Sequence, residues 1–357
     1  MDNLEIIKTK IHELDDDLLE KFLDYQEIKH ESDKQDHVLR TRKYRKKRIQ
    51  IKPSPQQTRE DYIALSDDKI IATALCSFQT LEQENNPDTM WAEIFVLPNY
   101  RQKGIGRAML RKIIEFAEEH NKQKIETGFY PSDFEFSEIY ITEKLGFKLG
   151  FTEQVSRIYR DKINWDYIKQ QEEKLTEIPK RYDIIGWDRK EYGKILTEDD
   201  EMAEKLADFY TEADNLLPKE NAEWNDVKYT AEDMRVDGQR MLETIEIANS
   251  FQFIAFDNGI PIAYSGTHFP NDPPVQDVGT GLTAVRKAYQ GKGIAKFLKM
   301  SMLRHYVDNY PEFEYISTEN AGTNAGMLHI NHSLGFTHHT DWHFYQGTVE
   351  GIQNYLG

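Results

Sequence analysis

The sequence has a single cysteine, Cys76, among its 357 residues, which excludes an intrachain disulfide framework. It has no run of 18 apolar residues, the minimum for a membrane-spanning helix. Positive charge is also scarce, because 45 Lys and Arg face 62 Asp and Glu and the formal net charge is −17. General binding to nucleic acid or to an anionic membrane needs excess positive charge, so neither partner is expected.

The first ten residues, MDNLEIIKTK, contain no apolar signal-peptide run. Together with the lone cysteine, this predicts a cytoplasmic protein. The negative charge of the chain would attract a cationic or amine substrate. Hydrophobic residues make up 39% of the chain, which is enough to fill two cores.

The sequence repeats itself. Residues 101–106 (RQKGIG) recur as residues 290–295 (QGKGIA), and the Leu-Gly-Phe at 145–147 recurs at 334–336. The offset from Gly104 to Gly293 is the same as the offset from Gly146 to Gly335, the glycines of the two Leu-Gly-Phe motifs. Two motifs that keep their mutual spacing indicate duplication of a whole domain.

The expected organisation is two copies of one α/β domain, at residues 1–163 and 181–357, joined by a charged linker helix over residues 164–180. A length of 357 residues fits two domains of about 100–200 residues each. In both copies, strands alternate with helices, which predicts a mixed sheet flanked by helices. Strands are expected near residues 61–66, 70–78, 90–97 and 124–130, and near residues 251–257, 260–268, 279–286 and 313–319.

The glycine loop at residues 101–106 lies between an apolar strand and an amphipathic helix. In such a loop, backbone N–H groups and a helix N-terminus converge on an anion, and glycine lets a phosphate approach closely. A Walker loop is excluded, since Gly-Lys-Ser/Thr is absent from both copies, and the G-x-G-x-x-G dinucleotide pattern is not met either.

The loops, each followed by Leu-Gly-Phe, resemble the GNAT superfamily of N-acetyltransferases, whose Q/R-x-x-G-x-G/A loop grips the pyrophosphate of acetyl-coenzyme A. The second copy (VGTGLTAVRKAYQGKGIAKFL) is similar to tandem members such as the mycothiol synthase group. The resemblance implies two tandem domains, each with a splayed central sheet, and acetyl-coenzyme A as co-substrate. The implied cofactor contacts of the first copy are Phe95, Val96, Gln102, Lys103, Gly104, Ile105, Gly106 and Arg107. Those of the second copy are Ala284, Val285, Gly291, Lys292, Gly293, Ile294, Ala295, Lys296, Asn324 and Asn331, with Asn320 bracing the turn.

Aminolysis of a thioester requires a base for the ammonium, a donor for the oxyanion and a route for the thiolate to leave. By resemblance, Glu319 is the candidate base, although a solvated loop carboxylate is the alternative. The backbone N–H of Val285 is the candidate oxyanion donor. Asn331 is a candidate donor to the sulfur or the pantetheine amide, or else a helix-surface amide. The tyrosine acid that many family members carry is replaced by Thr142 in the first copy and by Asn331 in the second.

The two copies are not equivalent. At the constant offset between them, the counterparts of Asn324 and Glu319 are Glu135 and Tyr130. Chemistry is therefore expected in the second copy, with the first copy structural, regulatory or a wall of the substrate cleft. Glu93 is the candidate base of the first copy, but a salt-bridged strand carboxylate is the favoured interpretation.

Three other patterns carry weaker signals. Five histidines between residues 329 and 343 have no recognised metal-ligand spacing, so no metal site is expected. The basic run at residues 40–48 is interpreted as a solvated or coenzyme-facing patch. The segment 209–215, with Trp224, suits an ammonium in an acceptor pocket, or is simply a helix that buries Phe209 and Tyr210.

The leading hypothesis is an N-acetyltransferase that moves acetyl from acetyl-coenzyme A to a primary amine of a small molecule or peptide, by direct attack in a ternary complex. The alternatives are a non-catalytic acyl-coenzyme A sensor and an acyltransferase with a different acyl donor. The sequence leaves the acceptor and the oligomeric state open.

Overall fold

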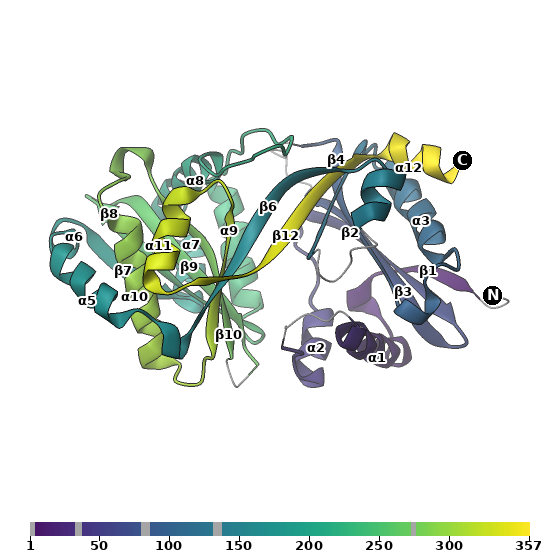
Figure 1. Cartoon of the computed structure of the whole chain (residues 1–357), viewed down its shortest axis with the longest axis horizontal. Helices are drawn as coiled ribbons and strands as arrows, with labels where there is room; N and C mark the ends of the chain where they lie inside the picture. The colour runs from purple at the N-terminus through teal and green to yellow at the C-terminus, as the bar shows by residue number, and fades with distance from the viewer. Residues whose placement is uncertain (1–3, 33–37, 80–85, 131–137, 273–275) are drawn as a thin grey trace. The chain divides into compact units, whose positions relative to one another are not determined.

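The computed structural model describes residues 4–32, 38–79, 86–130, 138–272 and 276–357. They form two compact units (Figure 1), and each unit contains segments from both halves of the sequence. Unit 1 comprises Met1–Thr152, Lys219–Asn225 and Asp341–Gly357, and unit 2 comprises Glu153–Pro218 and Asp226–Thr340. Division of the chain at residues 163 and 181 stays a prediction.

The sheet of unit 1 has the strand order β1-β2-β3-β4-β5-β12. The strands are β1 Glu5–Thr9, β2 Gln57–Ser66, β3 Lys69–Gln79, β4 Thr89–Val96, β5 Lys124–Phe129 and β12 Thr337–Thr348. Neighbours are antiparallel except β4 and β5, whose parallel pairing runs only from Thr89 with Lys124 to Trp91 with Glu126. Beyond Trp91, these two strands no longer pair, as expected for a splayed sheet.

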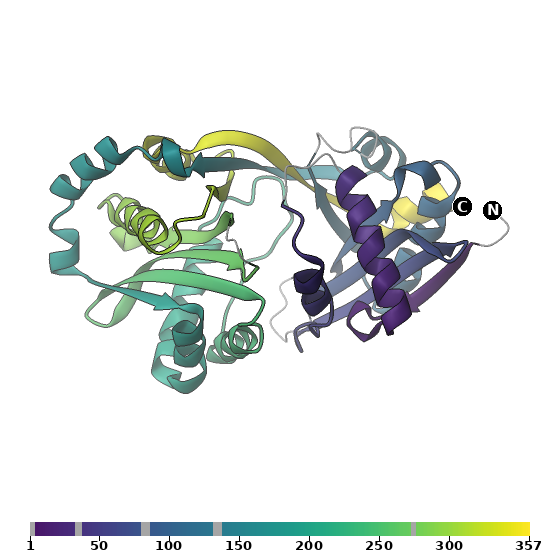
Figure 2. The same ribbon diagram turned by 90° about the horizontal axis from the view of Figure 1, so that it is seen from below.

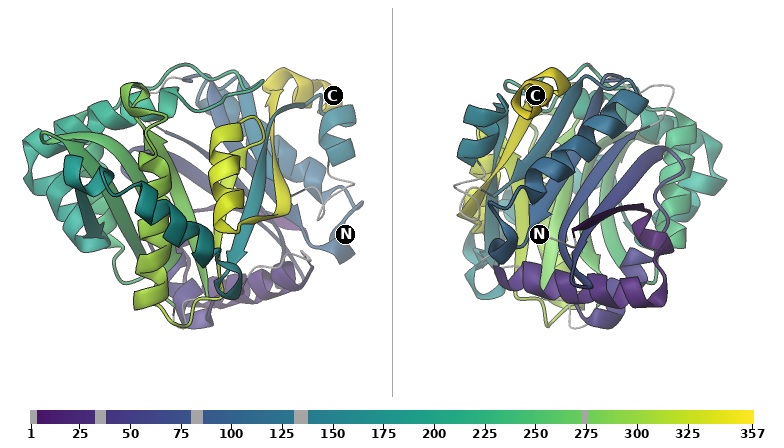
Figure 3. Two further views of the ribbon diagram at one scale, coloured as in Figure 1. Left: turned by 60° about the vertical axis from the view of Figure 1, so that its left-hand side comes forward. Right: turned by 90° about the vertical axis from the view of Figure 1, so that its right-hand side faces the viewer.

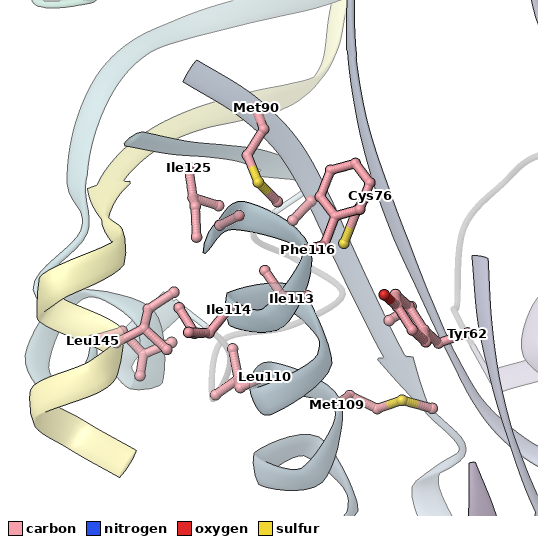
Figure 4. Close-up of a cluster of buried hydrophobic side chains, with 14 of the residues drawn as sticks. Tyr62, Cys76, Met90, Met109, Leu110, Ile113, Ile114, Phe116, Ile125 and Leu145 are labelled. Atoms are coloured by element: carbon pink, nitrogen blue, oxygen red, sulfur yellow. The ribbon is translucent and has the colours of Figure 1, made fainter. Parts of the chain in front are cut away.

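Helices cover both faces of this sheet (Figure 3, right). Helix α1 (Asp16–Ser32) lies across one face (Figure 2), where Leu19 and Leu23 pack on Ile63. Helices α3 (Ile105–Glu119) and α12 (Val349–Leu356) pack on the other face. The apolar side of α3 is buried against the strands (Figure 4). The side chains of α3 in this core are Ile105, Met109, Leu110, Ile113, Ile114, Phe116 and Ala117.

The basic run forms helix α2 (Arg42–Ile49), whose cations pair with the acidic side of α1. Arg42 lies 2.8 Å from Glu20 and 2.8 Å from Asp24, and Lys46 lies 3.1 Å from Glu20. Three other cations of the run, Lys43, Lys47 and Arg48, are exposed, as a solvated patch would be. That the run faces a coenzyme stays a prediction.

The sheet of unit 2 has the strand order β6-β11-β10-β9-β8-β7. The strands are β6 Lys148–Tyr159, β7 Asp183–Asp188, β8 Ala248–Asp257, β9 Ile260–Pro270, β10 Asp277–Val285 and β11 Tyr315–Ala321. Strands β10 and β11 are parallel, and their pairing ends at Gly279 with Ser317. The register of β10 on β9 shifts between Thr280 and Thr283, whereas β4 runs on β3 without a shift. The place where β10 and β11 stop pairing, called the split below, therefore has a bulge beside it. A bulge changes the direction of the backbone and of the side chains near it.

Helices cover both faces of this second sheet as well. On one face lie α5 Trp165–Lys174, α6 Ile178–Arg181, α10 Ile294–Asn309 and α11 Ala325–Leu334, and on the other α7 Arg189–Glu198, α8 Asp200–Asn215 and α9 Ala231–Glu243. The predicted linker forms α5 and α6, which pack on α10 and α11 through Ile168 and Ile178 (Figure 3, left). Within the described part of the chain, no helix is both long and apolar enough to cross a bilayer.

The last strand of each half is paired in the unit that holds most of the other half. Strand β12 pairs with β5 from His343 with Phe129 to Thr348 with Lys124. Strand β6 pairs with β11 from Tyr315 with Tyr159 to Ala321 with Glu153. Most of the strands expected from the sequence are thus confirmed, but their partners follow from this exchange.

The exchange predicts that residues 1–163 alone do not fold. Without the second half, β5 loses β12, one of its two neighbours, and the core around α3 loses three buried side chains, Tyr345, Val349 and Ile352. The fragment should lack a cooperative thermal transition by circular dichroism, whereas a fusion that adds residues 337–357 through a flexible linker should regain one. A cooperative transition in the isolated fragment would contradict the exchange.

Candidate functional site

Both glycine loops have the same backbone conformation. The second loop position is left-handed in each, with φ 59° at Gln102 and φ 75° at Gly291, and so is the fourth, with φ 83° at Gly104 and φ 85° at Gly293. Gly104 is the N-cap of α3 and Gly293 that of α10. The first N–H groups of each helix have no acceptor within the helix, so both loops present donors to an anion.

Each loop is fastened to the strand before it. Arg101 Nε donates to the carbonyl of Val96 at 2.9 Å, and Gln290 Nε2 donates to the carbonyl of Val285 at 3.2 Å. The equivalent side chain therefore makes the equivalent bond in both copies. This bond holds the end of the splayed strand, where the oxyanion donor is predicted, against the glycine loop.

The predicted cofactor contacts divide into loop residues and core residues. Gln102, Lys103, Gly104, Arg107, Gly291 and Lys292 are exposed; Val96, Gly106, Ala284, Val285, Gly293, Ala295 and Lys296 are half-buried; Phe95, Ile105 and Ile294 are buried. Phe95 packs beside α1, and the two isoleucines anchor α3 and α10 in their cores. Lys296 Nζ is bonded to Gln171 Oε1 at 3.0 Å. Which of them contacts a cofactor stays a prediction.

The surroundings of the two cap glycines differ. A Cβ added at Gly104 would meet nothing within 4 Å, but one added at Gly293 would lie 2.8 Å from the Leu175 side chain. Leu175 follows α5 and packs against α10. The second loop is therefore tighter around its cap glycine, whereas Gly291 has open space.

The pairing of β10 with β11 ends at Ser317. Glu319 is the next residue of β11 whose side chain lies on the same face of the sheet as that of Ser317. Its neighbours Ile316 and Thr318 are buried on the face that α10 and α11 cover, so Glu319 faces the other way. The side chain is exposed, yet the protein around its carboxylate removes enough water to raise the pKa of Glu319. The predicted base thus lies at the split.

A second carboxylate, Glu153, stands beside Glu319. Val155 of β6 pairs with Glu319 and Glu153 pairs with Ala321, so the two glutamates are diagonal neighbours on one face. Desolvation, with a smaller contribution from the charge of Glu319, raises the pKa of Glu153 to about 7. Sequence reasoning missed Glu153 because it belongs to the first half of the chain and reaches this site only through the strand exchange.

Unit 1 lacks this pair. The last paired residue before the split is Ser317 on β11 and Glu126 on β5. Two residues further along each strand lie Glu319 and Gly128, so Glu319 corresponds to Gly128 rather than to Tyr130, which the constant offset indicated. The constant offset fails here because the helix and its connection to the next strand are slightly longer in the second copy. There they run from the start of α10 to the start of β11, and in the first copy from the start of α3 to the start of β5. The counterpart of Glu153 is Trp342, whose indole occupies the place that a Gly128 Cβ would take. An aromatic ring thus replaces the carboxylates.

The predicted asparagines lie around α11. Asn331 is fully buried and donates from Nδ2 to Asn320 Oδ1 at 2.6 Å, which ties α11 to β11. Its own Oδ1 has no hydrogen-bond partner among the described residues. Asn324 caps α11 by accepting from the Met327 N–H at 3.2 Å. Contact of Asn324 or Asn331 with a cofactor stays a prediction, and Glu135, the first-copy counterpart of Asn324, lies outside the described residues.

The acceptor segment proposed from the sequence is only partly assembled. Phe209 is fully buried in the core around α8, as the alternative interpretation expected. Glu212 accepts from Arg286 at 2.7 Å and from the Lys287 N–H at 2.8 Å, so it anchors the end of β10. Trp224 belongs to unit 1 rather than to the unit that contains Phe209.

Sequence reasoning also missed a buried amine on α10. Lys299 is 1% exposed and occupies the position that matches Leu110, a core residue of α3, in the first copy. Its Nζ lies 5.4 Å from the centre of the Phe336 ring. Burial lowers the pKa of Lys299 to about 7, so near neutrality it is only partly charged.

The family model of the acetyltransferase (GNAT) family matches the chain twice, over residues 17–147 and 210–336. Each match ends at the phenylalanine of a Leu-Gly-Phe motif. Comparison with curated proteins gives no match.

Solved structures share the fold along nearly the whole chain. A tandem GNAT protein from the clavulanic acid biosynthesis pathway has a TM-score of 0.72 at 18% identity, covering 97% of this chain and 99% of its own. A GCN5-related N-acetyltransferase from Sphaerobacter thermophilus has a TM-score of 0.60 at 13% identity, covering 96% of each chain. At these identities the likeness is one of fold.

The buried amine gives a prediction about stability. Lys299→Met should raise the free energy of unfolding at pH 7 by on the order of 1–4 kcal/mol, because an apolar side chain then fills the site. The folded pKa of Lys299 is lowered to about 7 from 10.5, so the unfolded chain holds the extra proton and wild-type stability rises between these pH values. Denaturant melts should show the advantage of the variant shrinking as pH rises from 7 towards 10. An advantage independent of pH would contradict the assignment.

Proposed function

Because the chain belongs to the acetyltransferase (GNAT) family, we propose that it transfers the acetyl group of acetyl-coenzyme A to a primary amine of a small molecule or peptide. The observation that carries this proposal is the pair of carboxylates, Glu153 and Glu319, at the split in the sheet of unit 2. The same unit carries a glycine loop whose helix N-terminus suits a pyrophosphate.

In the proposed complex, the loop before α10 holds the pyrophosphate and the acetyl group enters between β10 and β11. The bulge in β10 lies between this loop and the last paired residue of the split. It supports the assignment of a backbone N–H near Val285 as oxyanion donor, because a bulge turns backbone groups out of the ladder. Asn320, Asn324 and Asn331 flank the same strand end.

The proposed step is direct attack of the amine on the thioester. The ammonium of a primary amine has an ordinary pKa of about 10 and must first lose a proton, which Glu319 accepts. The carbon–nitrogen bond then forms, the carbon–sulfur bond breaks and the coenzyme A thiolate leaves. The second proton that the attacking nitrogen loses on becoming an amide goes to this thiolate. A thiol of pKa about 8.5 is a tolerable leaving group, so the missing tyrosine acid does not prevent the reaction.

Glu153 supplies the second element of the proposed base. Two carboxylates side by side titrate as a pair, and one of them is held protonated at higher pH than an isolated glutamate. A pKa of about 7 at Glu153 is better matched to accepting an amine proton near neutrality than an unperturbed carboxylate. The two residues are therefore assigned as one proton-accepting unit.

Unit 1 is proposed to have no part in the chemical step. Its loop repeats the backbone of the second loop, so it remains a candidate site for a second acetyl-coenzyme A. Gly128 and Trp342 stand where unit 2 has its carboxylates, and the fourth strand has no bulge. Coenzyme binding without transfer is the role these features favour.

Substitution of the pair tests the mechanism. Glu319→Gln should lower kcat/KM by roughly a hundredfold or more towards an amine found by screening, because general base catalysis contributes 10²–10⁴-fold. In the remaining activity, the rising limb of the pH profile should move to lower pH, since Glu153 loses the negative neighbour that helps to raise its pKa. Glu153→Gln should also slow turnover.

The control is Glu312→Gln, an exposed carboxylate shortly before β11, which should leave turnover unchanged. Unchanged turnover in both glutamine variants of the pair would remove it from the mechanism. Failure of the wild-type protein to acetylate any amine, with coenzyme binding intact, would favour the non-catalytic alternative.

Matched substitutions show which loop holds the cofactor. Ala295→Glu places a carboxylate at the second residue of α10, and Gly106→Glu places one at the second residue of α3. The backbone is helical at both positions, and a side chain at Gly106 would enter open space. Each should abolish pyrophosphate binding at its own loop by charge repulsion. Substitution of Gly293 would instead clash with Leu175.

Calorimetric titration with acetyl-coenzyme A reports the outcome. If Ala295→Glu loses one binding site for acetyl-coenzyme A and also loses transfer activity, chemistry in unit 2 is supported. Activity lost only in Gly106→Glu would place the working cofactor in unit 1 and would remove Glu319 from the reaction.

A further inference from the structure

Five aromatic side chains meet on one face of unit 1, outside the two hydrophobic clusters around α3 and α1. They are Trp91, Phe151, Trp224, Trp342 and Phe344, called the aromatic cluster below. The rings of Phe151 and Phe344 are stacked at 4.7 Å, and that of Trp224 meets Phe344 edge-on at 4.9 Å. The indoles of Trp91 and Trp342 are nearly parallel at 13°, with their centres 6.4 Å apart.

Two carboxylates belong to this cluster. Glu126 pairs across the strands with Trp91 and accepts from Trp224 Nε1 at 2.7 Å and from Gln346 Nε2 at 2.9 Å. Glu93 accepts from Trp91 Nε1 at 2.7 Å. Indole and amide donors are neutral, so these bonds orient the carboxylates without cancelling their charge. Within the described ranges, neither carboxylate has an ion-pair partner within 4 Å.

A strap fixes Trp224 in place. It is the segment Lys219–Asn225, which belongs to unit 1. The Asn221 N–H donates to the Gly150 carbonyl at 2.9 Å, the Glu223 N–H donates to Gln346 Oε1 at 2.9 Å, and Glu223 pairs with Lys124 at 2.9 Å. Trp224 is thereby held as a wall of the cluster by the bonds of the strap.

A bound cation would stabilise the charged form of the partly buried Glu126 carboxylate. Burial raises the pKa of this carboxyl, and its hydrogen bonds from Trp224 and Gln346 only partly oppose the rise. Lys124, the nearest cation on the same strand, is engaged by Glu223. Indole faces attract cations, and the attraction grows when the cation is shielded from water.

From this arrangement we propose that the aromatic cluster, with Glu93 and Glu126, is a binding site for a small organic ammonium ion. The indole faces of Trp91, Trp224 and Trp342 would contact the alkyl groups, and the two carboxylates would supply the opposite charge. The site lies wholly in unit 1 and involves neither the carboxylate pair nor the loop of unit 2. It is therefore independent of the proposed transfer.

The test uses tetramethylammonium, which has no group to acetylate, and tert-butanol as a neutral molecule of similar shape. Three of the five tryptophans of the chain lie in the cluster, so intrinsic fluorescence reports on it. Tetramethylammonium should change the emission saturably, whereas tert-butanol should not. In Glu126→Gln, which keeps an oxygen acceptor for Trp224, the Kd should rise by roughly tenfold or more.

The matched control is Glu115→Gln, which removes one charge from the opposite face of the same unit, where Glu115 pairs with Lys112. Its Kd should stay within about twofold of the wild type. If Glu126→Gln lacks a cooperative thermal transition, Glu93→Gln serves in its place, with the same expected weakening. Equal responses to both probes, an unchanged Kd in the glutamine variant or the absence of saturable binding would each overturn the proposal. Any of these results would leave acetyl transfer by unit 2 untouched.

Discussion

Pairing of each terminal strand with the opposite half of the chain is the constraint on which the rest of the structure depends. Strand β12 completes the sheet of unit 1 at β5, and β6 completes the sheet of unit 2 at β11. Each unit therefore buries side chains that the other half supplies, such as Tyr345 in the core around α3. We therefore expect neither copy of the sequence to fold as an independent domain. The candidate site has the same dependence, since Glu319 and Glu153 come from different halves.

Within this shared framework, side chains rather than backbone distinguish the units. The glycine loops are left-handed at the same two positions, the second and the fourth, although glutamine occupies the second position in unit 1. At the split, unit 2 has two adjacent carboxylates, which repel one another and are tolerated because one can hold a proton. Unit 1 has glycine and an indole there, which removes the repulsion, and the indole fills the place that a Gly128 Cβ would take. Duplication has thus kept the backbone of the glycine loop twice and the pair of carboxylates once.

The sequence was sufficient for features that depend on local chemistry. The repeat, the strand and helix order and the loop before α10 could all be predicted, because glycine at an N-cap and hydrophobic periodicity act over a few residues. Glu153 could not, because its partner Glu319 lies in the other half of the sequence and their register is set by strand exchange. The equivalence of Glu319 with Tyr130 failed where the helix–strand connection changes length. The ion pairs between α2 and α1 could not be predicted either, because only folding brings these two helices alongside.

The carboxylates of the aromatic cluster are hard to explain by the stability of the fold alone. A glutamine at position 126 would still offer an oxygen to the Trp224 indole and would avoid the cost of burying a charge. Burial raises the pKa of Glu126, which is the effect expected of this cost. A bound ammonium ion would recover it, because the same burial that penalises a lone charge strengthens the attraction between opposite charges. The aromatic side chains then do more than pack. They exclude water from the ion pair, and their ring faces attract a cation rather than a neutral molecule.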